Sequence, residues 1–574
     1  MKWILPEESS DNFFSFLLSK RNINDIDGFL NPTLDQIHSP TLLLNIDKAI
    51  DTILGAVRDK KKILIHGDFD ADGITATSIM WDFLYRRLGA DVVPYIPSRF
   101  DEGYGLSDES IGNIIEAGGE LIITVDCGVK DVLLVEKYKE KIDFLITDHH
   151  TLLNASEVAD EIQDKVIIEG EYAISKYAKA VVHPKLGDYP FKEVCGAVVS
   201  WKVCKAISKY LTNNSVDGII YDKNFDANSY LELAALGTVC DVMPLIDENR
   251  AIVKLGLDKM KNSTNPGINA LFEIAGSDIK EASTYHLGYI IGPRLNAAGR
   301  LETAMGGVRL LSTSSEEHAR QYAGELNELN IRRQNITKEV YEEAEAKLDK
   351  QDKHILVYGE NWPEGIIGLI AGKLSQKYNK PTFVCSYNTD EGILKGSARS
   401  PGYLNLAETL KELDSDLLRH GGHAGAAGFS LDYSALNSFS TNLKKYIDEE
   451  ISQGDIEETL SIDGVIALKN LDFGVIEKLN LLQPFGYGNA KPTVALMGCE
   501  IIDKLEIGRD KTHLKFIVKS ESSPIEAIGF NFKEKFKIKD YSTLDLAGYL
   551  DINEWNGNRK INLILKDVRA TEFS

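Results

Sequence analysis

The segment HGDFDADG, residues 66–73, concentrates acidic groups at the end of an apolar run. Asp68, Asp70 and Asp72 stand two residues apart, between a histidine and a glycine. Like charges this close repel one another unless something positive holds them together. We therefore expect a metal ion or a basic partner at this segment.

Two further groups of acids and histidines follow apolar runs. Asp126 follows ELIITV, the triplet Asp148-His149-His150 follows IDFLIT, and another acid, Asp241, lies in ALGTVCDVMPL. Carboxylates mixed with imidazoles suit Mn²⁺, Mg²⁺ or Zn²⁺, whereas a thiolate set would indicate structural zinc. A carboxylate shared by two such cations would suit hydrolysis of a phosphodiester. The candidate ligands are His66, Asp70, Asp72, Asp126, His149 and Asp241.

Alternating strand and helix patterns must position these residues. We expect strands at 61–66, 90–96, 120–125 and 142–147, and helices at 73–89, 108–119 and 131–141. Such alternation predicts a mostly parallel sheet covered on both faces. Open sheets of this kind bind ligands at the carboxyl ends of their strands, and all three clusters follow strands there.

Each cluster taken alone also has a structural interpretation. A DxDxDG run can bind calcium, but the acid that such a loop needs at a later position is absent here. Asp126 could cap a helix, Asp241 could occupy a cap or a turn, and His149 could simply end a strand. The edge that these residues share favours a functional site.

Two groups rich in arginine and glycine suit phosphate binding. The candidates are Arg294 and Arg300 in GPRLNAAGR, and Ser397, Arg399 and His423 in GSARS and RHGGHAGAAG. Glycine turns present N–H groups to anions, and arginine binds phosphate through paired hydrogen bonds. Tight turns with surface arginines are the alternative. No P-loop is present, which disfavours an NTPase.

The rest of the pattern predicts an α/β chain in several parts. Apolar spacing predicts one long amphipathic helix, with a break near Arg332 as an open alternative. A second α/β region follows, then a polar linker at 449–458, then short strands typical of a small OB-type barrel. The expected parts are an N-terminal segment packed on the core that holds the candidate site (1–55), a parallel-sheet domain (56–311), the connecting helix (312–350), a second α/β domain (351–450) and an all-β OB-fold domain (456–574).

Aromatic residues lie among lysines in the last part of the chain. They could form a groove on which single-stranded nucleic acid stacks, or they could belong to the core, and the sequence leaves both open. The residues are Tyr487, Phe530, Phe532, Tyr549 and Trp555.

Composition restricts the class of protein. The 574 residues carry a formal net charge of −23, which argues against general nucleic-acid binding but allows a local basic groove. The six cysteines form no CxxC pair, as expected for reduced thiols. We expect a cytoplasmic protein with no membrane association, because no apolar run can span a bilayer and the N-terminus lacks a signal-peptide pattern.

These motifs together resemble the DHH phosphoesterase superfamily, which is named for a triplet like Asp148-His149-His150. The resemblance is close to its bacterial exonucleases that act on single-stranded DNA, and it covers about residues 60 to 490. It rests on HGDFDADG, VDCG, TDHH, ALGTVCDVMPL, GPRLNAAGR, GSARS, GGHAGAAG and QPFGYGN. It implies a DHH catalytic domain joined by the long helix to a DHHA1 domain that binds substrate, followed by an OB-fold domain that binds DNA.

The resemblance also implies roles for individual residues around two divalent cations, Mn²⁺ or Mg²⁺. One cation would be held by His66, Asp70 and Asp126, and the other by Asp72, Asp126, His149 and Asp241. Asp68 and Asp148 would support these ligands, and His150 would face the scissile phosphate. The implied catalytic residues are Asp70, Asp72, Asp126, His149, His150 and Asp241. The implied substrate contacts are Arg294, Asn296, Arg300, Ser397, Arg399, Gly422 and His423.

The implied activity is 5′-to-3′ hydrolysis of single-stranded DNA to mononucleotides in recombination and repair. The implied partners are single-strand-binding protein and a RecQ-type helicase, and we expect a monomer. One alternative is a DHH phosphodiesterase on short RNA or cyclic dinucleotides, which the long C-terminal part disfavours. Another is an inactive replication scaffold, which the complete set of ligands disfavours. With no sequence after the OB-like part, we expect no additional partner-binding domain.

Overall fold

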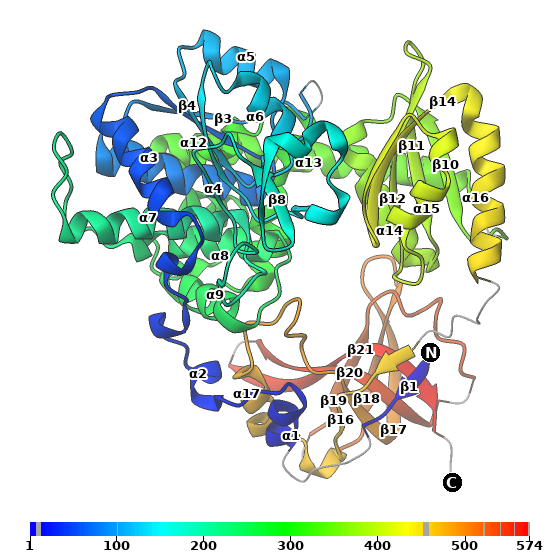
Figure 1. Ribbon diagram of the computed structural model, residues 1–574. Helices are drawn as coiled ribbons and strands as arrows, with labels where there is room; N and C mark the ends of the chain where they lie inside the picture. The colour runs from blue at the N-terminus through cyan, green and yellow to red at the C-terminus, as the bar shows by residue number, and fades with distance from the viewer. Residues whose placement is uncertain are drawn as a thin grey trace. The chain divides into compact units, whose positions relative to one another are not determined.

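The computed structural model describes residues 1–6, 13–99, 102–349, 351–451, 459–520, 523–539, 541–555 and 557–571. The chain divides into two compact units, whose helices and strands are labelled in Figure 1. One contains His38–Met243 and Leu255–Ile456, and the other contains Met1–Ile37, Pro244–Lys254 and Glu457–Ser574. The expected linker at 449–458 falls largely on residues 452–458, which lie outside the described residues.

A five-stranded parallel sheet organises the first part of the larger unit. Its strand order is β3 (Val92–Tyr95), β2 (Ile63–Gly67), β4 (Leu121–Val125), β5 (Asp143–Thr147) and β9 (Ala180–Val182). The expected strands and crossover helices are therefore confirmed. Apolar residues of β2, β4 and β5 pack on the helices α5 (Asp108–Glu116) and α6 (Val132–Tyr138).

The sheet register aligns the ends of its central strands. Gly67 pairs with Val125, and Val125 pairs with Thr147. The residue after each of these is an aspartate: Asp68, Asp126 and Asp148. Parallel strands thus bring three acids that are distant in sequence to the same level of one sheet edge.

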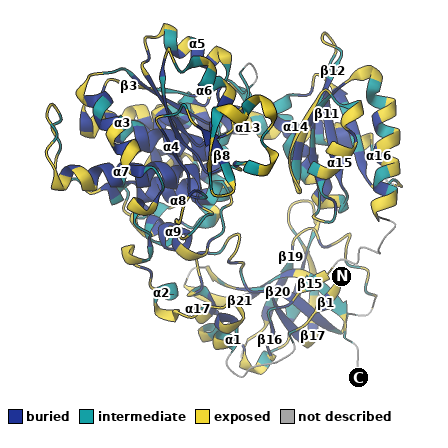
Figure 2. Cartoon of the chain, in the orientation of Figure 1, coloured by how far each residue is buried: buried dark blue, intermediate teal, exposed yellow. Residues whose placement is uncertain are grey.

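Buried helices surround this edge. The helix α4 (Ala71–Asp82) follows β2 and is buried from Ala71 to Met80, as Figure 2 shows in dark blue. It packs against α7 (Gly196–Asn213) and α8 (Leu231–Cys240). The helix α11 (Gly292–Leu301) continues directly from a π-helical segment, η8 (His286–Ile291).

A long helix leads to the second α/β part. The helix α13 (Glu316–Ala346) runs without a break at Arg332. The following sheet has the order β10 (Ile355–Glu360), β11 (Thr382–Asn388), β12 (Ile393–Arg399), β14 (Ala426–Asp432) and β13 (Arg419–His423). One face packs on α13 and α14 (Glu364–Tyr378), and the other on α15 (Leu406–Glu412) and α16 (Leu436–Ile451).

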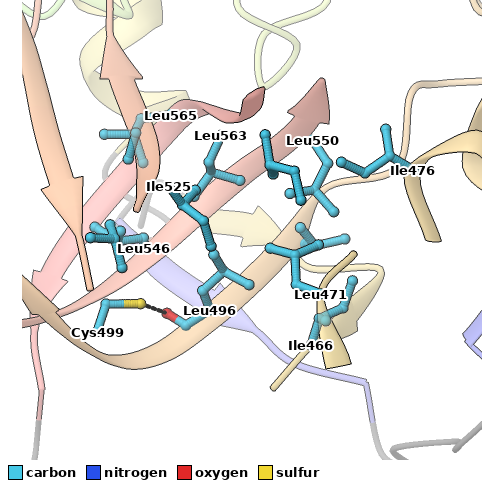
Figure 3. Close-up of a cluster of buried hydrophobic side chains, with 14 of the residues drawn as sticks. Ile466, Leu471, Ile476, Leu496, Cys499, Ile525, Leu546, Leu550, Leu563 and Leu565 are labelled. Atoms are coloured by element: carbon cyan, nitrogen blue, oxygen red, sulfur yellow. Dashed lines mark hydrogen bonds between the residues drawn. The ribbon is translucent and has the colours of Figure 1, made fainter. Parts of the chain in front are cut away.

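The smaller unit contains a closed β-barrel, as the sequence predicts. Pairing of β17 (Val494–Ile507) with both β18 (His513–Val518) and β20 (Thr543–Trp555) closes the ring through β19 (Ile525–Gly529) and β21 (Asn558–Ala570). Leu496, Leu546 and Leu563 fill its interior (Figure 3). The domain also contains the helix α17 (Phe473–Asn480), which the strand pattern did not predict.

The N-terminal segment differs from the expectation. Met1–Ile37 belongs to the unit of the barrel, not to that of the catalytic candidates. The physical reason is that β1 (Lys2–Ile4) pairs with β15 (Thr459–Ser461), while Leu17 and Leu18 enter the barrel core. The helix α3 (Ile46–Arg58), in contrast, belongs to the unit of the parallel sheet.

No helix in the described part of the chain is both long and apolar enough to cross a bilayer. All six cysteines are free thiols.

Candidate metal centre and phosphate-binding residues

Local hydrogen bonds fix the acids of the first motif. The carboxylate of Asp70 caps α4 by accepting from the N–H groups of Asp72 at 2.9 Å and Gly73 at 3.1 Å. The carboxylate of Asp72 accepts from Gly196 N at 2.6 Å and Ala197 N at 2.9 Å. These two donors lie at the start of α7, where a helix favours negative charge.

Asp126, His149 and Asp241 meet in front of Asp72. The Nε2 atom of His149 lies 3.0 Å from Asp126 Oδ1, 3.5 Å from Asp241 Oδ2 and 3.8 Å from Asp72 Oδ2. Asp126 has a positive φ of 64°, an uncommon backbone for a residue other than glycine. Strain of this kind occurs at sites where the surrounding structure holds a functional side chain in place.

The ligand atoms form three overlapping groups, each within 4.8 Å: Asp68, Asp70 and Asp126; Asp72, His149 and Asp241; and Asp126, His149 and His150. Asp68, expected only to support the site, thus joins Asp70 and Asp126. Asp126 takes part in two of the groups, as a carboxylate shared by two cations would.

The protein leaves polar atoms of this cluster unpaired. Buried side-chain atoms without a hydrogen-bond partner here are His66 Nε2, Asp68 Oδ1, Asp126 Oδ1, His149 Nε2 and Asp241 Oδ2. Unpaired buried polar atoms are costly, and their clustering indicates a missing partner. Because they are hard oxygen and imidazole donors, they fit Mn²⁺ or Mg²⁺.

The charges of the cluster lead to the same conclusion. Burial and the charges of Asp72, Asp70 and Asp68 raise the pKa of Asp241 to about 9. Burial and the neighbouring carboxylates also raise the pKa of Asp126 well above its ordinary value. Ionising all these acids at neutral pH therefore requires cations among them.

His66 lies outside the three groups. Its ring stacks on Tyr95 at 5.5 Å between centroids, and its Nδ1 atom lies 3.6 Å from Cys127 Sγ. Burial lowers the pKa of His66 to about 4, which keeps the ring neutral as a metal ligand requires. Of the two ring nitrogens of His66, Nε2 is the one that is buried without a hydrogen-bond partner.

Asp148 supports the two histidines of its triplet. Its carboxylate accepts from the N–H groups of His149 at 2.7 Å and of His150 at 3.1 Å, and lies 2.9 Å from His150 Nδ1. The side-chain hydrogen bond to His150 and the charges of the nearby histidines hold the pKa of Asp148 below its ordinary value despite burial. Tyr104 completes the chain, with its hydroxyl 3.0 Å from His150 Nδ1 and donating to Asp126 O at 3.2 Å.

Two glycines make room for the carboxylates. A Cβ atom at Gly196 would lie 2.5 Å from Asp126 Cβ, and one at Gly237 would lie 2.5 Å from Asp72 Oδ1. Both distances are far below van der Waals contact. The packing of α7 and α8 against the acids therefore depends on residues without side chains.

A cluster of guanidinium groups adjoins the acids. Arg300 donates to Gly365 O at 2.9 Å, and Arg399 donates to Ser397 Oγ at 3.1 Å. Burial, then the positive charges of Arg99 and Arg333, lower the pKa of Arg300 to about 10. Burial and Arg99 likewise lower the pKa of Arg399. Buried cations that repel one another are arranged to receive an anion.

Other predicted phosphate-binding residues have different surroundings. Arg294 donates to Ile290 O at 2.6 Å and to Asn327 Oδ1 at 3.1 Å, so helices hold its guanidinium. Asn296 Oδ1 accepts from Ala71 N at 2.8 Å and thereby fixes the start of α4. Gly422 and His423 lie on the exposed strand β13, where Gly422 has a φ of 144°.

Sequence reasoning missed Arg99, Tyr104 and the two glycines. Arg99 and Tyr104 lie in the segment after β3, at the carboxyl end of another strand of the same sheet. Their position directly after a predicted strand of the parallel sheet could have identified both residues as candidates. Gly196 and Gly237 carry no chemistry of their own, and only the packing reveals their role.

The aromatic residues of the barrel domain divide between surface and core. Tyr487 is 67% exposed and Phe530 is 56% exposed, whereas Phe532 is buried in the barrel core. Tyr549 is partly buried, with Lys491 Nζ 5.0 Å from its ring centroid. The side chain of Trp555 lies outside the described residues.

Three family models match successive parts of the chain. The DHH family N-terminal domain matches residues 62–238, the DHHA1 domain matches 351–449, and the RecJ OB domain matches 462–567. Their order confirms the resemblance and the fold class predicted from sequence motifs.

Curated relatives match over nearly the whole chain. The single-stranded-DNA-specific exonuclease RecJ of Bacillus subtilis is 34% identical over 97% of this chain and 68% of its own length. The protein of the same name from Haemophilus influenzae is 32% identical over 95% of this chain and 94% of its own length.

Solved structures of RecJ from Thermus thermophilus have the same fold. The complex with Mn²⁺ is 27% identical, with a TM-score of 0.80 over 100% of this chain and 80% of that chain. The complex with Mg²⁺ is 26% identical, with a TM-score of 0.75 over 100% of this chain and 79% of that chain. The chain therefore belongs to the RecJ family of single-stranded-DNA-specific exonucleases, within the DHH superfamily.

Proposed function

We propose that this protein is a metal-dependent exonuclease that hydrolyses single-stranded DNA from the 5′ end and releases mononucleotides. The relatives named as single-stranded-DNA-specific exonucleases support the substrate class. The observation that carries the proposal is the convergence of unpaired buried carboxylate and imidazole atoms around Asp126 at the sheet edge.

Two divalent cations, Mn²⁺ or Mg²⁺, would be the cofactors. One would be held by His66, Asp68, Asp70 and Asp126, and the other by Asp72, Asp126, His149 and Asp241. Bound there, the cations would supply Lewis acidity to the scissile phosphodiester and to the water that attacks it. RecJ structures in complex with Mn²⁺ and Mg²⁺ support this assignment.

The protein's own groups would orient the reaction. Asp72 is fixed by the α7 N-terminus, so its position depends on backbone hydrogen bonds that need no rearrangement during catalysis. His150, held by Asp148 and Tyr104, would face the scissile phosphate and donate a hydrogen bond to it. Catalysis would thus involve Asp70, Asp72, Asp126, His149, His150 and Asp241.

The guanidinium cluster would bind the 5′-terminal phosphate. In addition to burial, the charge of Arg99 lowers the pKa of both Arg300 and Arg399, and a phosphate dianion would relieve this repulsion. Ser397, Gly422 and His423 would complete this pocket from the DHHA1 domain, while Arg294 and Asn296 would line the path of the strand. Because the net charge is −23, DNA binding would depend on this local cluster.

We further propose a role in recombination and repair in the cytoplasm, as a monomer delivered to DNA by single-strand-binding protein and a RecQ-type helicase. These assignments follow from the family rather than from a described surface. Pull-down of purified chain with each candidate protein tests them, and absence of binding would contradict them.

The test of the enzymatic proposal is digestion of single-stranded DNA labelled at either end, with Mn²⁺ or Mg²⁺. Early release of the 5′ label by the wild type, and its loss in Asp126→Ala, would support the activity and its polarity. Early release of the 3′ label would contradict the polarity. No digestion with any divalent cation would contradict the activity itself and favour an inactive scaffold.

A further inference from the structure

Two exposed tyrosines stack on each other on the helical segment that leads into α11. Tyr285 is 62% exposed and Tyr289 is 75% exposed, and their rings lie 5.4 Å apart with an interplanar angle of 27°. The residues are four apart, so they share one face of a continuous helical segment that includes η8 and α11. Large aromatic faces left in water commonly mark binding surfaces.

The opposite face of the same helix is anchored in the protein. Leu287, Ile291 and Leu295 are buried. A Cβ atom at Gly292 would lie 2.6 Å from Cys240 Sγ, so the helix passes close to the residue that precedes Asp241. The helix that carries the tyrosine pair is therefore anchored by its buried face against the end of α8, the helix that Asp241 follows.

The helical segment of the tyrosines continues into residues of the proposed DNA path. Asn296 and Arg300 lie four residues apart on one face of α11, seven and eleven residues after Tyr289 along the same continuous helical segment. Asn296 holds the start of α4, and Arg300 belongs to the guanidinium cluster. The axial separation of Tyr289 and Arg300 is about 16 Å, a span of a few nucleotides.

We propose that Tyr285 and Tyr289 form a stacking platform for nucleobases of the DNA strand on the 3′ side of the scissile phosphate. The inference rests on the proposed function. With the 5′ phosphate at Arg300 and the acids beside Asn296, the strand still to be digested would extend over the tyrosine pair. Stacking on aromatic rings tolerates every base, which suits an exonuclease that must accept any sequence.

The platform would contribute mainly to holding the strand. Removing an aromatic ring that stacks on a base costs about 1–3 kcal/mol, or about fivefold to 150-fold in affinity. The KM for DNA of the double variant Tyr285→Ala/Tyr289→Ala is therefore expected to rise by that factor, with a smaller change in kcat. The double variant Tyr285→Phe/Tyr289→Phe keeps both rings and is expected to behave as the wild type.

The experiment measures KM and kcat with Mn²⁺ on two 5′-phosphorylated single strands. One is an unmodified oligonucleotide, and the other carries abasic nucleotides at the third to sixth positions from the 5′ end. Tyr210→Ala is the matched control, since this exposed tyrosine of α7 lies about 21 Å along the helix from Gly196.

If the platform stacks bases, the double alanine variant has a higher KM than the wild type for the unmodified strand. On the abasic strand the two proteins have the same KM, because that strand has no bases at the positions that would stack. An equal loss on both strands would indicate a structural effect and overturn the inference. Wild-type kinetics of the alanine variant would also overturn it and assign this face to another partner. A wild type that digests neither strand would contradict the proposed function instead.

Discussion

Gly196→Ala tests whether the position of Asp126 controls catalysis. The added Cβ atom would lie 2.5 Å from Asp126 Cβ and 2.6 Å from Asp126 Oδ1. Ordinary contacts between such atoms are about 3.5 Å, so the carboxylate must move by about 1 Å. The Gly196 N–H that binds Asp72 is retained in the variant, so the perturbation acts mainly on Asp126.

A displacement of about 1 Å at a catalytic group lowers kcat/KM by about 100-fold. Forcing a methyl group into this packed site also destabilises the fold by about 1–3 kcal/mol. We therefore expect a chain that still folds, binds Mn²⁺ more weakly and digests single-stranded DNA about 100-fold more slowly. The assays are urea unfolding, calorimetric Mn²⁺ titration and release of labelled mononucleotides.

Gly55→Ala is the control, because no atom lies within 4 Å of its added Cβ on α3. It should leave activity unchanged and change stability by less than about 1 kcal/mol. Wild-type Mn²⁺ affinity together with wild-type kcat/KM in Gly196→Ala would refute the assignment of Asp126 as the shared ligand.

The charges of the site lead to three further predictions. In EDTA, the folded chain keeps a proton on Asp241 up to its pKa of about 9, whereas the unfolded chain releases it near pH 4. The free energy of unfolding should therefore fall from pH 7 to pH 9, by up to about 1.4 kcal/mol per pH unit for that proton. In Asp241→Asn, urea titrations should show a smaller decrease of the free energy of unfolding between pH 7 and pH 9. An equal decrease in the variant and the wild type would argue against the raised pKa of Asp241. Arg399→Ala should remove most of the preference for 5′-phosphate over 5′-hydroxyl ends in competition assays, whereas retained preference would place the phosphate elsewhere. Raising KCl from about 50 to about 200 mM should strongly increase the KM for DNA; a constant KM would contradict phosphate binding by a local basic cluster.

The parallel sheet and its acidic edge could be predicted because their signals are local. Each strand is a short apolar run, and each acid follows its strand directly, so alternation alone places Asp68, Asp126 and Asp148 at one edge. The pairing register then adds the detail that Gly67, Val125 and Thr147 are neighbours.

Long-range packing accounts for what the sequence did not indicate. Arg99 acts through its charge on Arg300 and Arg399, which are about 200 and 300 residues away in sequence. Met1–Ile37 joins the barrel unit through one strand pairing and through Leu17 and Leu18. No local sequence pattern indicates which unit this segment packs with. Hydrogen-bond partners also cannot be read from motifs, as the contacts of Arg294 with Ile290 and Asn327 illustrate.

The central claim is that the acids around Asp126 hold two divalent cations. Crystals of the wild type soaked in Mn²⁺ test it directly through anomalous scattering at the manganese edge. We expect two anomalous peaks on either side of the Asp126 carboxylate, about 3.5–4 Å apart, and the loss of both in Asp126→Ala. A single peak away from Asp126 would contradict the claim that two cations bind there. So would the absence of any manganese peak in crystals in which the protein is active.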